Sequence, residues 1–284
     1  MRVLVLGGTA EGRALAEQLH PRVDIISSLA GRVPDPALPA GPVRIGGFGG
    51  AEGLRDWLVG NDITAVVDAT HPFAATMTAN AAKACAELGM PHVVLNRPPW
   101  DAAGATAVAT DTDAAEIIAA KGYSRVFLTT GRSGVAAFSG SDAWFLIRVV
   151  TAPEAAVLPT NHELVFSRGP YRYDDECELL RKRRIEVLVT KNSGGALTEA
   201  KLDAARALGA DVVMIRRPAL PEGVAIVSLV TDAVAWCSAR VTPRREYGVA
   251  GGCGVPLGLR RPDDQQTTHI DIGRVEVSQS NDLH

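Results

Sequence analysis

A segment of this chain occurs twice, and the repeat narrows the possible folds further than any other feature. Val66 to Pro98 aligns with Glu186 to Pro218 at a constant shift of 120 residues and without a gap. Each copy reads as a strand, a polar loop, an alanine-rich helix, a Leu-Gly pair, a second strand and Arg-Pro. Leu-Gly is typical of a helix end, because glycine adopts the left-handed cap conformation at low cost. The period is too long for a solenoid and favours two similar α/β lobes, although two ordinary βαβ units can also resemble each other by chance.

Short apolar runs alternate with alanine-rich stretches through most of the chain, which predicts parallel sheets covered by helices. We expect strands at 2–6, 22–27, 63–68, 92–95, 125–129, 144–150, 163–167, 186–190 and 211–215, and helices at 10–19, 51–59, 73–88, 112–120, 174–183, 196–207 and 231–239. The predicted fold class is α/β, with two Rossmann-like lobes that face each other across a cleft, each a parallel sheet flanked by helices. Residues 1–100 and 101–244 are expected to form the lobes, and the weakly periodic residues 245–284 a disordered tail.

Composition and charge limit the class of protein. A net charge of −3 over 284 residues gives no whole-chain reason to expect a nucleic-acid or membrane partner. No stretch reaches the ~20 apolar residues that span a bilayer, and glycines interrupt the apolar run at the N-terminus, unlike in a secretory signal. The four cysteines are far apart and show no metal-ligand spacing. We therefore expect a cytoplasmic protein without a bound metal, with a monomer as the favoured state.

Two turns in the first half indicate a nucleotide site. Gly7 to Arg13 follows the first expected strand and opens a helix, so that small residues and oriented N–H groups can face a phosphate. Thr9 stands where the fingerprint G-x-G-x-x-G requires glycine, so a tight turn that binds nothing is the alternative. After the second strand, Ser28 and Arg32 replace the acid that usually holds the ribose of NAD. Hydroxyls and a guanidinium suit a 2′-phosphate and favour NADPH over NADH, with a plain surface loop as the alternative.

Two further strand-end segments of the first half are polar or rich in glycine. Gly46 to Gly50 either lines the cofactor, flexes as a lid or forms a long turn. Asp68, Thr70 and His71 form a polar cluster after a strand. With an ordinary pKa near 6.5, His71 can donate a hydrogen bond or a proton. The alternative is a helix cap beside a packed histidine.

The second half offers matching turns. Lys191 takes the position of His71 in the repeat, in a turn with Asn192, Ser193 and glycines where a phosphate or carboxylate would fit. The order of a P-loop is absent, and a helix-capping turn with an exposed lysine is the alternative. Arg132, which ends another hydroxyl-glycine turn, is a candidate clamp for a carboxylate or a phosphate. Neither a G-x-S-x-G elbow nor an H-E-x-x-H motif occurs, so a hydrolase is disfavoured.

Together and in order, these segments resemble the precorrin-6A reductases of cobalamin biosynthesis. The matching segments are LGGTAEGR (6–13), SLAGR (28–32), GGFGG (46–50), DATHPFA (68–74), NRPPW (96–100), TTGR (129–132), Gly169-Pro170 with Glu176, VTKNSGG (189–195) and RRP (216–218). The resemblance covers about residues 2–240. It implies NADPH-dependent reduction of one double bond of the precorrin-6A macrocycle to give precorrin-6B. It also implies two domains with the active site between them, without flavin or metal.

Under this resemblance the candidate site can be assigned residue by residue. The catalytic candidates are Lys191, Arg13 and His71, and Arg13, Arg132 and Lys191 suit the anchoring of acetate and propionate groups. His71 is the weaker candidate as proton donor, because water can also supply the proton. The expected cofactor contacts are Gly8, Thr9, Ala10, Glu11, Ser28, Arg32, Gly49, Thr70, Thr130, Gly131, Arg132, Asn192, Ser193 and Gly194.

Three alternatives stay open at this point. The first is an NADH-dependent reductase of the cobalt-containing intermediate, which Arg32 and the serines disfavour. The second is another NADPH-dependent reductase of similar fold. The third is a non-catalytic nucleotide-sensing module, which has no need for a second lobe with its own polar loops. The resemblance ends after about Arg244, and His269 and His284 in the tail are expected to be solvated and not to bind metal.

Overall fold

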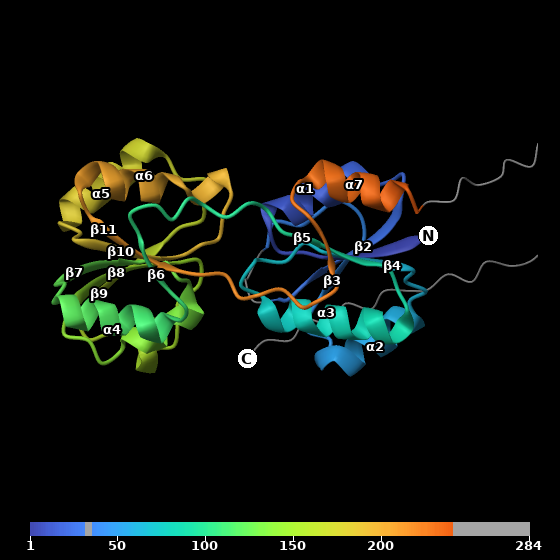
Figure 1. Cartoon of the computed structure of the whole chain (residues 1–284), viewed down its shortest axis with the longest axis horizontal. Helices are drawn as coiled ribbons and strands as arrows, with labels where there is room; N and C mark the ends of the chain where they lie inside the picture. Colours follow the sequence, from blue (N-terminus) through green and yellow to red (C-terminus); the bar gives the residue numbers. More distant parts are fainter. Residues whose placement is uncertain (32–35, 241–284) are drawn as a thin grey trace, which may run out of the picture. The chain divides into compact units, whose positions relative to one another are not determined.

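The first of two parallel sheets has six strands in the order β12-β5-β4-β1-β2-β3 in the computed structural model, which describes residues 1–31 and 36–240. Its strands are β1 (Arg2–Leu6), β2 (Asp24–Leu29), β3 (Val43–Ile45), β4 (Ala65–Asp68), β5 (His92–Leu95) and β12 (Ala225–Val227). One face is covered by α1 (Ala10–Leu19) and α7 (Val230–Ser238), and the other by α2 (Gly50–Gly60) and α3 (Ala75–Leu88) (Figure 1).

The second sheet repeats this arrangement, in the order β6-β11-β10-β7-β8-β9. Its strands are β6 (Thr106–Val108), β7 (Arg125–Leu128), β8 (Trp144–Val149), β9 (His162–Phe166), β10 (Val187–Lys191) and β11 (Asp211–Ile215). The helix α4 (Asp111–Lys121) covers one face, and α5 (Tyr173–Arg183) and α6 (Ala200–Leu208) cover the other (Figure 1). In the described part of the chain, 3₁₀ turns also occur at Arg132–Phe138, Ala155–Val157 and Ala196–Thr198.

Each central strand supplies side chains to two cores, one on either face of its sheet. In β1, Val3 and Val5 pack with residues of α1 and α7, whereas Leu4 and Leu6 pack with residues of α2 and α3. In β7, Phe127 packs with residues of α5 and α6. All five side chains are at most 2% exposed. Burial on both faces explains why these strands are almost continuously apolar in the sequence.

The internal repeat corresponds to a structural repeat. The unit β4–α3–β5 of the first sheet matches β10–α6–β11 of the second, and in each sheet the central strands and helices follow the order of a doubly wound fold. Gly89 and Gly209 end α3 and α6 with φ of 59° and 70°, the left-handed conformation expected from Leu-Gly. The predicted α/β fold with two Rossmann-like lobes is therefore confirmed. A cleft between the lobes stays a prediction.

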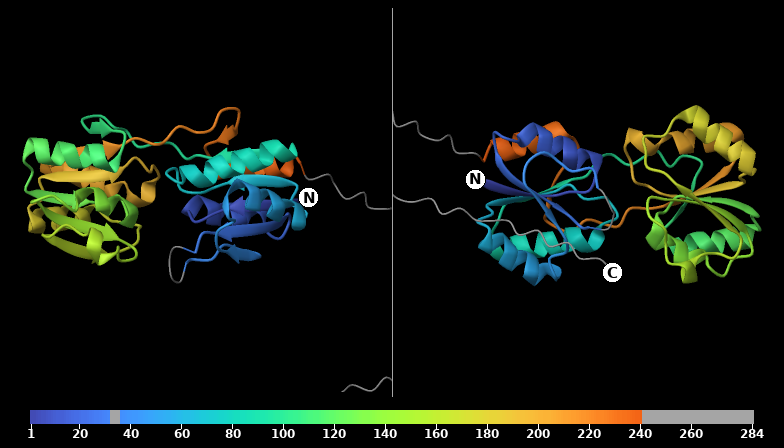
Figure 2. Two further views of the ribbon diagram at one scale, coloured as in Figure 1. Left: turned by 90° about the horizontal axis from the view of Figure 1, so that it is seen from below. Right: turned by 180° about the vertical axis from the view of Figure 1, so that it is seen from behind.

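The two sheets exchange their sixth strands. The strand β6 follows β5 in the chain but pairs with β11 of the second sheet, whereas β12 follows β11 and pairs with β5 of the first. Figure 2 shows the two connections that carry the chain from one lobe to the other and back. The helix α7 then packs on α1 through Ala233 and Cys237. The structure differs here from the expectation that residues 101–244 form one lobe. The strand β12 pairs in the first sheet, and α7 packs on α1 of the first lobe.

Several sequence predictions fall on residues that the structure does not describe. They concern Arg32, the tail at residues 245–284, and His269 and His284 within it. Within residues 1–31 and 36–240, no helix is both long enough and apolar enough to cross a lipid bilayer.

Candidate active site

The turn after β1 leaves open space at the start of α1. Its first peptide is fixed to the neighbouring strand, since the Gly7 N–H donates to the Ser28 carbonyl over 2.9 Å. Thr9 caps α1, because its hydroxyl oxygen accepts from the Gly12 N–H over 3.0 Å. Gly8 has a φ of 111°, and no atom lies within 4 Å of the position that a Cβ would take there. Free N–H groups in front of open space are what an anion needs at a helix start.

Thr9 departs from the dinucleotide fingerprint for a structural reason. Its hydroxyl donates to the Ala69 carbonyl over 2.7 Å, which ties the turn after β1 to the loop after β4. A Cβ on Gly12 would lie 3.4 Å from both the Gly7 Cα and the Thr9 Oγ1, so α1 packs closely against the turn at this residue. The turn therefore keeps Gly12, the fingerprint glycine that allows close helix packing. At the middle glycine of the fingerprint it has Thr9 instead, whose side chain forms hydrogen bonds.

Next to the end of β2 lies Arg44 of β3, a residue that the sequence did not single out. Ser28 pairs in register with Arg44 of β3, and the Arg44 Nη1 donates to the Ser28 Oγ over 3.2 Å. The same guanidinium donates to the carbonyls of Gly46 and Gly47, each over 2.6 Å, and lies 3.7 Å from the centre of the Phe48 ring. Gly49 then precedes α2 with a φ of 79°. The glycine-rich loop is therefore organised around one arginine.

The loop after β4 places a buried carboxylate beside a histidine. Asp68 is 1% exposed, and its Oδ1 accepts from the N–H and the hydroxyl of Thr70 over 3.0 and 2.6 Å. Its Oδ2 has no hydrogen-bond partner among the described residues. The Nδ1 of His71 accepts from the Phe73 N–H over 3.2 Å, so the hydrogen of the neutral ring lies on Nε2. This arrangement leaves Nε2–H as the single N–H donor of the neutral ring.

His71 lies in a cationic environment. The protein atoms around the ring disfavour its charged form, and the positive charges of Arg97, Lys191, Arg217 and Lys201 add to this effect. Together they lower the pKa of His71 to about 4. The lowered pKa favours the neutral imidazole near pH 7, in which Nε2–H is the hydrogen-bond donor.

Lys191 lies at the carboxyl end of β10, as predicted. Its Nζ donates to the Thr130 carbonyl over 3.0 Å and lies 3.6 Å from the Asp111 carboxylate and 5.6 Å from the centre of the Phe73 ring. The contact with Phe73 brings the lysine next to the loop that contains His71. The Thr130 hydroxyl and one oxygen of Asp111 are buried without a partner in the described part of the chain. Polar groups of the second lobe and an aromatic ring of the first thus surround Lys191.

The turn after β10 is held by a tryptophan. The side-chain amide of Asn192 exchanges hydrogen bonds with the backbone of Trp100, at 2.8 Å to the N–H and 3.1 Å to the carbonyl. The Trp100 indole donates to the Gly195 carbonyl over 3.0 Å. Gly194 has a φ of 66°, and a Cβ there would overlap with the Pro98 carbonyl. The sequence NRPPW at the end of β5 therefore shapes the turn VTKNSGG of the other lobe.

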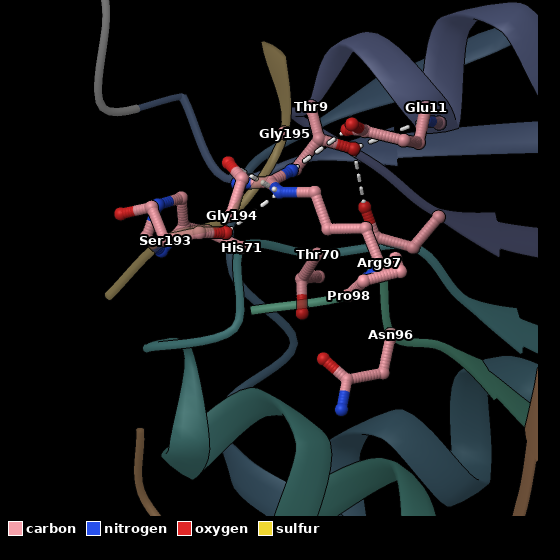
Figure 3. A network of polar contacts seen from close by, with 12 residues as sticks. Thr9, Glu11, Thr70, His71, Asn96, Arg97, Pro98, Ser193, Gly194 and Gly195 are labelled. Atoms are coloured by element: carbon pink, nitrogen blue, oxygen red, sulfur yellow. Dashed lines mark hydrogen bonds and ion pairs between the residues drawn. The ribbon is translucent and has the colours of Figure 1, made fainter. Parts of the chain in front are cut away.

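Two arginines related by the repeat, Arg97 and Arg217, join the turns of the two lobes, and Figure 3 shows Arg97 between Glu11 and the Ser193–Gly195 segment. Arg97 donates to the Ser193 carbonyl over 2.7 Å through Nε, and its Nη1 forms an ion pair with Glu11 of α1 at 2.7 Å. Arg217 donates to the Asn192 and Ser193 carbonyls and to the Arg97 carbonyl. The turn after β1 and the turn after β10 are therefore neighbours, as a shared site requires. The sequence motifs contained both arginines, but the contacts by which they join the two lobes were not predicted.

Two predicted residues show no such contacts. The side chains of half-buried Arg13 and exposed Arg132 form no hydrogen bond or ion pair with the described residues. Gly131, before Arg132, has a φ of 77°. Both arginines remain candidates for an anionic ligand. Across 1–31 and 36–240, no three His, Cys, Asp or Glu residues are grouped so that they could hold a metal ion.

Two doubly wound sheets, whose strand-end turns meet through a pair of arginines, define a two-lobed protein of the Rossmann-like class. A family model described as precorrin-6x reductase CbiJ/CobK matches residues 2–238. The precorrin-6A reductase of Mycobacterium tuberculosis is 68% identical over 235 residues, which cover 83% of this chain and 96% of that protein. A solved structure of CobK precorrin-6A reductase matches with a TM-score of 0.79 and 40% identity, over 86% of this chain and 99% of that one. The chain belongs to the precorrin-6x reductase family.

Relatives with a related name are more distant. The cobalt-precorrin-6A reductase of Priestia megaterium is 29% identical over 237 residues, which cover 78% of this chain and 92% of that protein.

Proposed function

We propose that this chain reduces one double bond of precorrin-6A to give precorrin-6B, with NADPH as the hydride source. Family membership supports the reaction and a tetrapyrrole substrate. The observation that carries the choice of site is the contact of the Gly7–Arg13 turn with the Asn192–Gly195 turn through Arg97. A hydride transfer needs two ligands held side by side, and two neighbouring strand-end regions provide for that.

The first lobe has the features that a pyridine nucleotide needs. The start of α1, with the open space at Gly8, fits the pyrophosphate. Ser28 lies at the end of β2, where doubly wound folds hold the adenosine ribose. We assign Thr70 and the Nε2–H of His71 to the nicotinamide end, because both residues follow β4 in the same lobe. The buried Oδ2 of Asp68, which lacks a partner among the described residues, fits an additional hydrogen bond in that region.

The second lobe fits the macrocycle. Lys191 and Arg132 lie at its strand ends and suit the carboxylates of the acetate and propionate groups. Arg13 lies at the start of α1, with no partner of its own in the described chain, and suits either a phosphate or a carboxylate. Thr130, Gly131, Asn192, Ser193 and Gly194 surround this region and are proposed cofactor contacts at the shared boundary.

The chemistry requires one hydride and one proton. When bound, NADPH supplies a hydride to one carbon of the double bond, and a proton adds to the neighbouring atom, so that the substrate gains two electrons and two hydrogens. The low pKa of His71 keeps its ring neutral, so the role we propose for it is to orient a ligand through Nε2–H. The proton comes from Lys191 or from water, and Lys191 polarises the acceptor.

The alternative substrate is the cobalt-containing intermediate. A relative of that name is 29% identical, against 68% for a relative named precorrin-6A reductase, which favours the metal-free substrate. A nucleotide-sensing module is disfavoured by the polar turns of the second lobe. The proposal also includes that the protein is cytoplasmic, monomeric and without a nucleic-acid partner. Light scattering tests the monomeric state.

The experiment that tests the proposal follows tetrapyrrole and nicotinamide absorbance after the protein is mixed with precorrin-6A and NADPH under anaerobic conditions. We expect stoichiometric oxidation of NADPH. Lys191→Ala and Arg13→Ala should each lower turnover at least about tenfold, or about 1.4 kcal/mol of barrier, while the fold is retained. Lys83→Ala, at an exposed lysine of α3, is the control that should keep the full rate. Oxidation only with the cobalt complex, or bound but never oxidised NADPH, would contradict the proposal.

A further inference from the structure

The proposed reaction assigns no role to Arg44. It lies on β3 at the carboxyl end of the sheet, in register with Ser28 of β2. Ser28 in turn pairs with Leu6 of β1, and its carbonyl accepts the N–H of Gly7. Only β2 therefore lies between Arg44 and β1, the strand that leads into the turn before α1.

The guanidinium is rigidly held. It lies over the Phe48 ring at 3.7 Å and within 5.5 Å of the Trp57 ring. Nη1 donates to the Ser28 hydroxyl and the Gly46 carbonyl, and Nη2 donates to the Gly47 carbonyl. Of the five N–H groups of an arginine, these contacts leave the Nε–H and one hydrogen of Nη2 available for a ligand.

The charge of Arg44 has no counter-ion in the described part of the chain. Arg97 and Arg148 are held arginines that do have acid partners, Glu11 and Glu176. Arg217 is held by carbonyls, as Arg44 is. The partners of Arg44 are instead two carbonyls and a hydroxyl, none of which carries a negative charge. A half-buried cation without an acid partner is suited to an anion from outside the chain.

The position in the fold indicates which anion. In doubly wound folds the residue after β2 contacts the adenosine ribose, and an arginine near this point accommodates a 2′-phosphate. We propose that Arg44, together with the Ser28 hydroxyl, binds the 2′-phosphate of NADPH and so selects it over NADH. This inference rests on the proposed function, because it concerns the same nucleotide site.

The carbonyl contacts explain why arginine is needed. They fix the plane of the guanidinium, so that its free N–H groups keep one direction for a phosphate. A lysine at this position would keep the charge but could not hold both carbonyls and the phosphate in this planar geometry. Arg44→Lys is therefore expected to recover only part of the affinity.

The proposal is tested by measuring the affinity of the whole chain for four nucleotides. Isothermal titration is carried out with NADPH, NADH, adenosine 2′,5′-bisphosphate and AMP. Arg44→Gln should weaken NADPH and the bisphosphate at least about tenfold, with NADH and AMP changed less than twofold. Arg55→Gln removes an equal charge from an exposed position of α2 and should leave all four affinities unchanged.

Each result decides between distinct possibilities. An equal loss for NADPH and NADH would mean that Arg44 only shapes the Gly46–Gly50 loop, and would overturn the proposal. Unchanged NADPH affinity would overturn it as well. If the wild-type chain bound none of the four compounds, the proposed function would fail first, and this outcome is distinct from both of the others.

Discussion

Lys201 is buried beneath the turn of the second lobe, and its substitution should stabilise the protein. The side chain is 4% exposed, its Nζ donates to the Thr198 carbonyl over 2.8 Å, and it lies 4.4 Å from the centre of the Trp100 ring. Burial, and then the charge of Arg148, lower the pKa of Lys201 from 10.5 to about 7, although Glu176 acts in the opposite direction. The folded state therefore disfavours the charged lysine that the unfolded chain carries.

The size and pH dependence follow from proton linkage. A pKa of about 7 against 10.5 corresponds to about 5 kcal/mol of lost stability when the lysine must lose its proton or bury its charge. The unfolded state binds more protons between pH 7 and 10.5, so this loss is present at pH 7 and below and disappears as the pH rises through that window. Methionine removes the loss but also the hydrogen bond, which is worth about 1.5–3 kcal/mol. We expect Lys201→Met to gain about 2–3 kcal/mol at pH 7.

Denaturant unfolding at pH 7, 8.5 and 10 provides the assay, with Lys182→Met as the control at an exposed position of α5. The difference between Lys201→Met and wild type should shrink as the pH rises, while the control follows wild type throughout. A variant that is less stable than wild type at pH 7, or a difference that does not change with pH, would refute the reasoning.

Three further predictions concern the candidate site. Gly194→Ala should lower stability by at least about 2 kcal/mol and reduce turnover, because of backbone strain and overlap with the Pro98 carbonyl. The control Gly209→Ala has a similar φ but open space around its Cβ, and it should cost about 1 kcal/mol of stability and keep turnover. Equal effects of the two substitutions would argue against the overlap. The NMR titration of His71 should give a pKa of about 4, and Lys191→Met should raise it by removing a positive charge; an unchanged value would exclude that interaction. Arg97→Lys, which loses the Nε contacts to the turn, should lower kcat/KM about tenfold, and a wild-type value would show that the turn is held without them.

The central strands and helices of the fold could be predicted because their apolar patterns extend over many residues. The limits of β5 and β11 match the predicted ranges 92–95 and 211–215, and those of α1 match 10–19. The strands β3, β6 and β12 were missed, since each has three residues and is partly exposed at or near a sheet edge. Periodicity does not resolve so short a run, and nothing local indicates which sheet it joins. The exchange of β6 and β12 therefore could not be predicted.

Some residues of the candidate site could likewise be predicted from the sequence, and others could not. Lys191 ends a strand, and Thr9 and His71 follow strands, so their place at the carboxyl ends of the sheets could be predicted from topology. The roles of Arg97, Arg217 and Arg44 depend on contacts with residues distant in the sequence or on an adjacent edge strand. The one available signal was the repetition of Arg-Pro after the fifth strand of each lobe, at the shift of 120.

The most direct test of a shared site for nucleotide and macrocycle is the fate of a labelled hydride. NADPH carrying deuterium at the transferable C4 position is incubated with the protein and precorrin-6A, and the tetrapyrrole product is analysed by mass spectrometry. The account predicts that each product molecule acquires one deuterium at a carbon atom that does not exchange with water. A reduced product without deuterium would mean that the two ligands do not meet in this site.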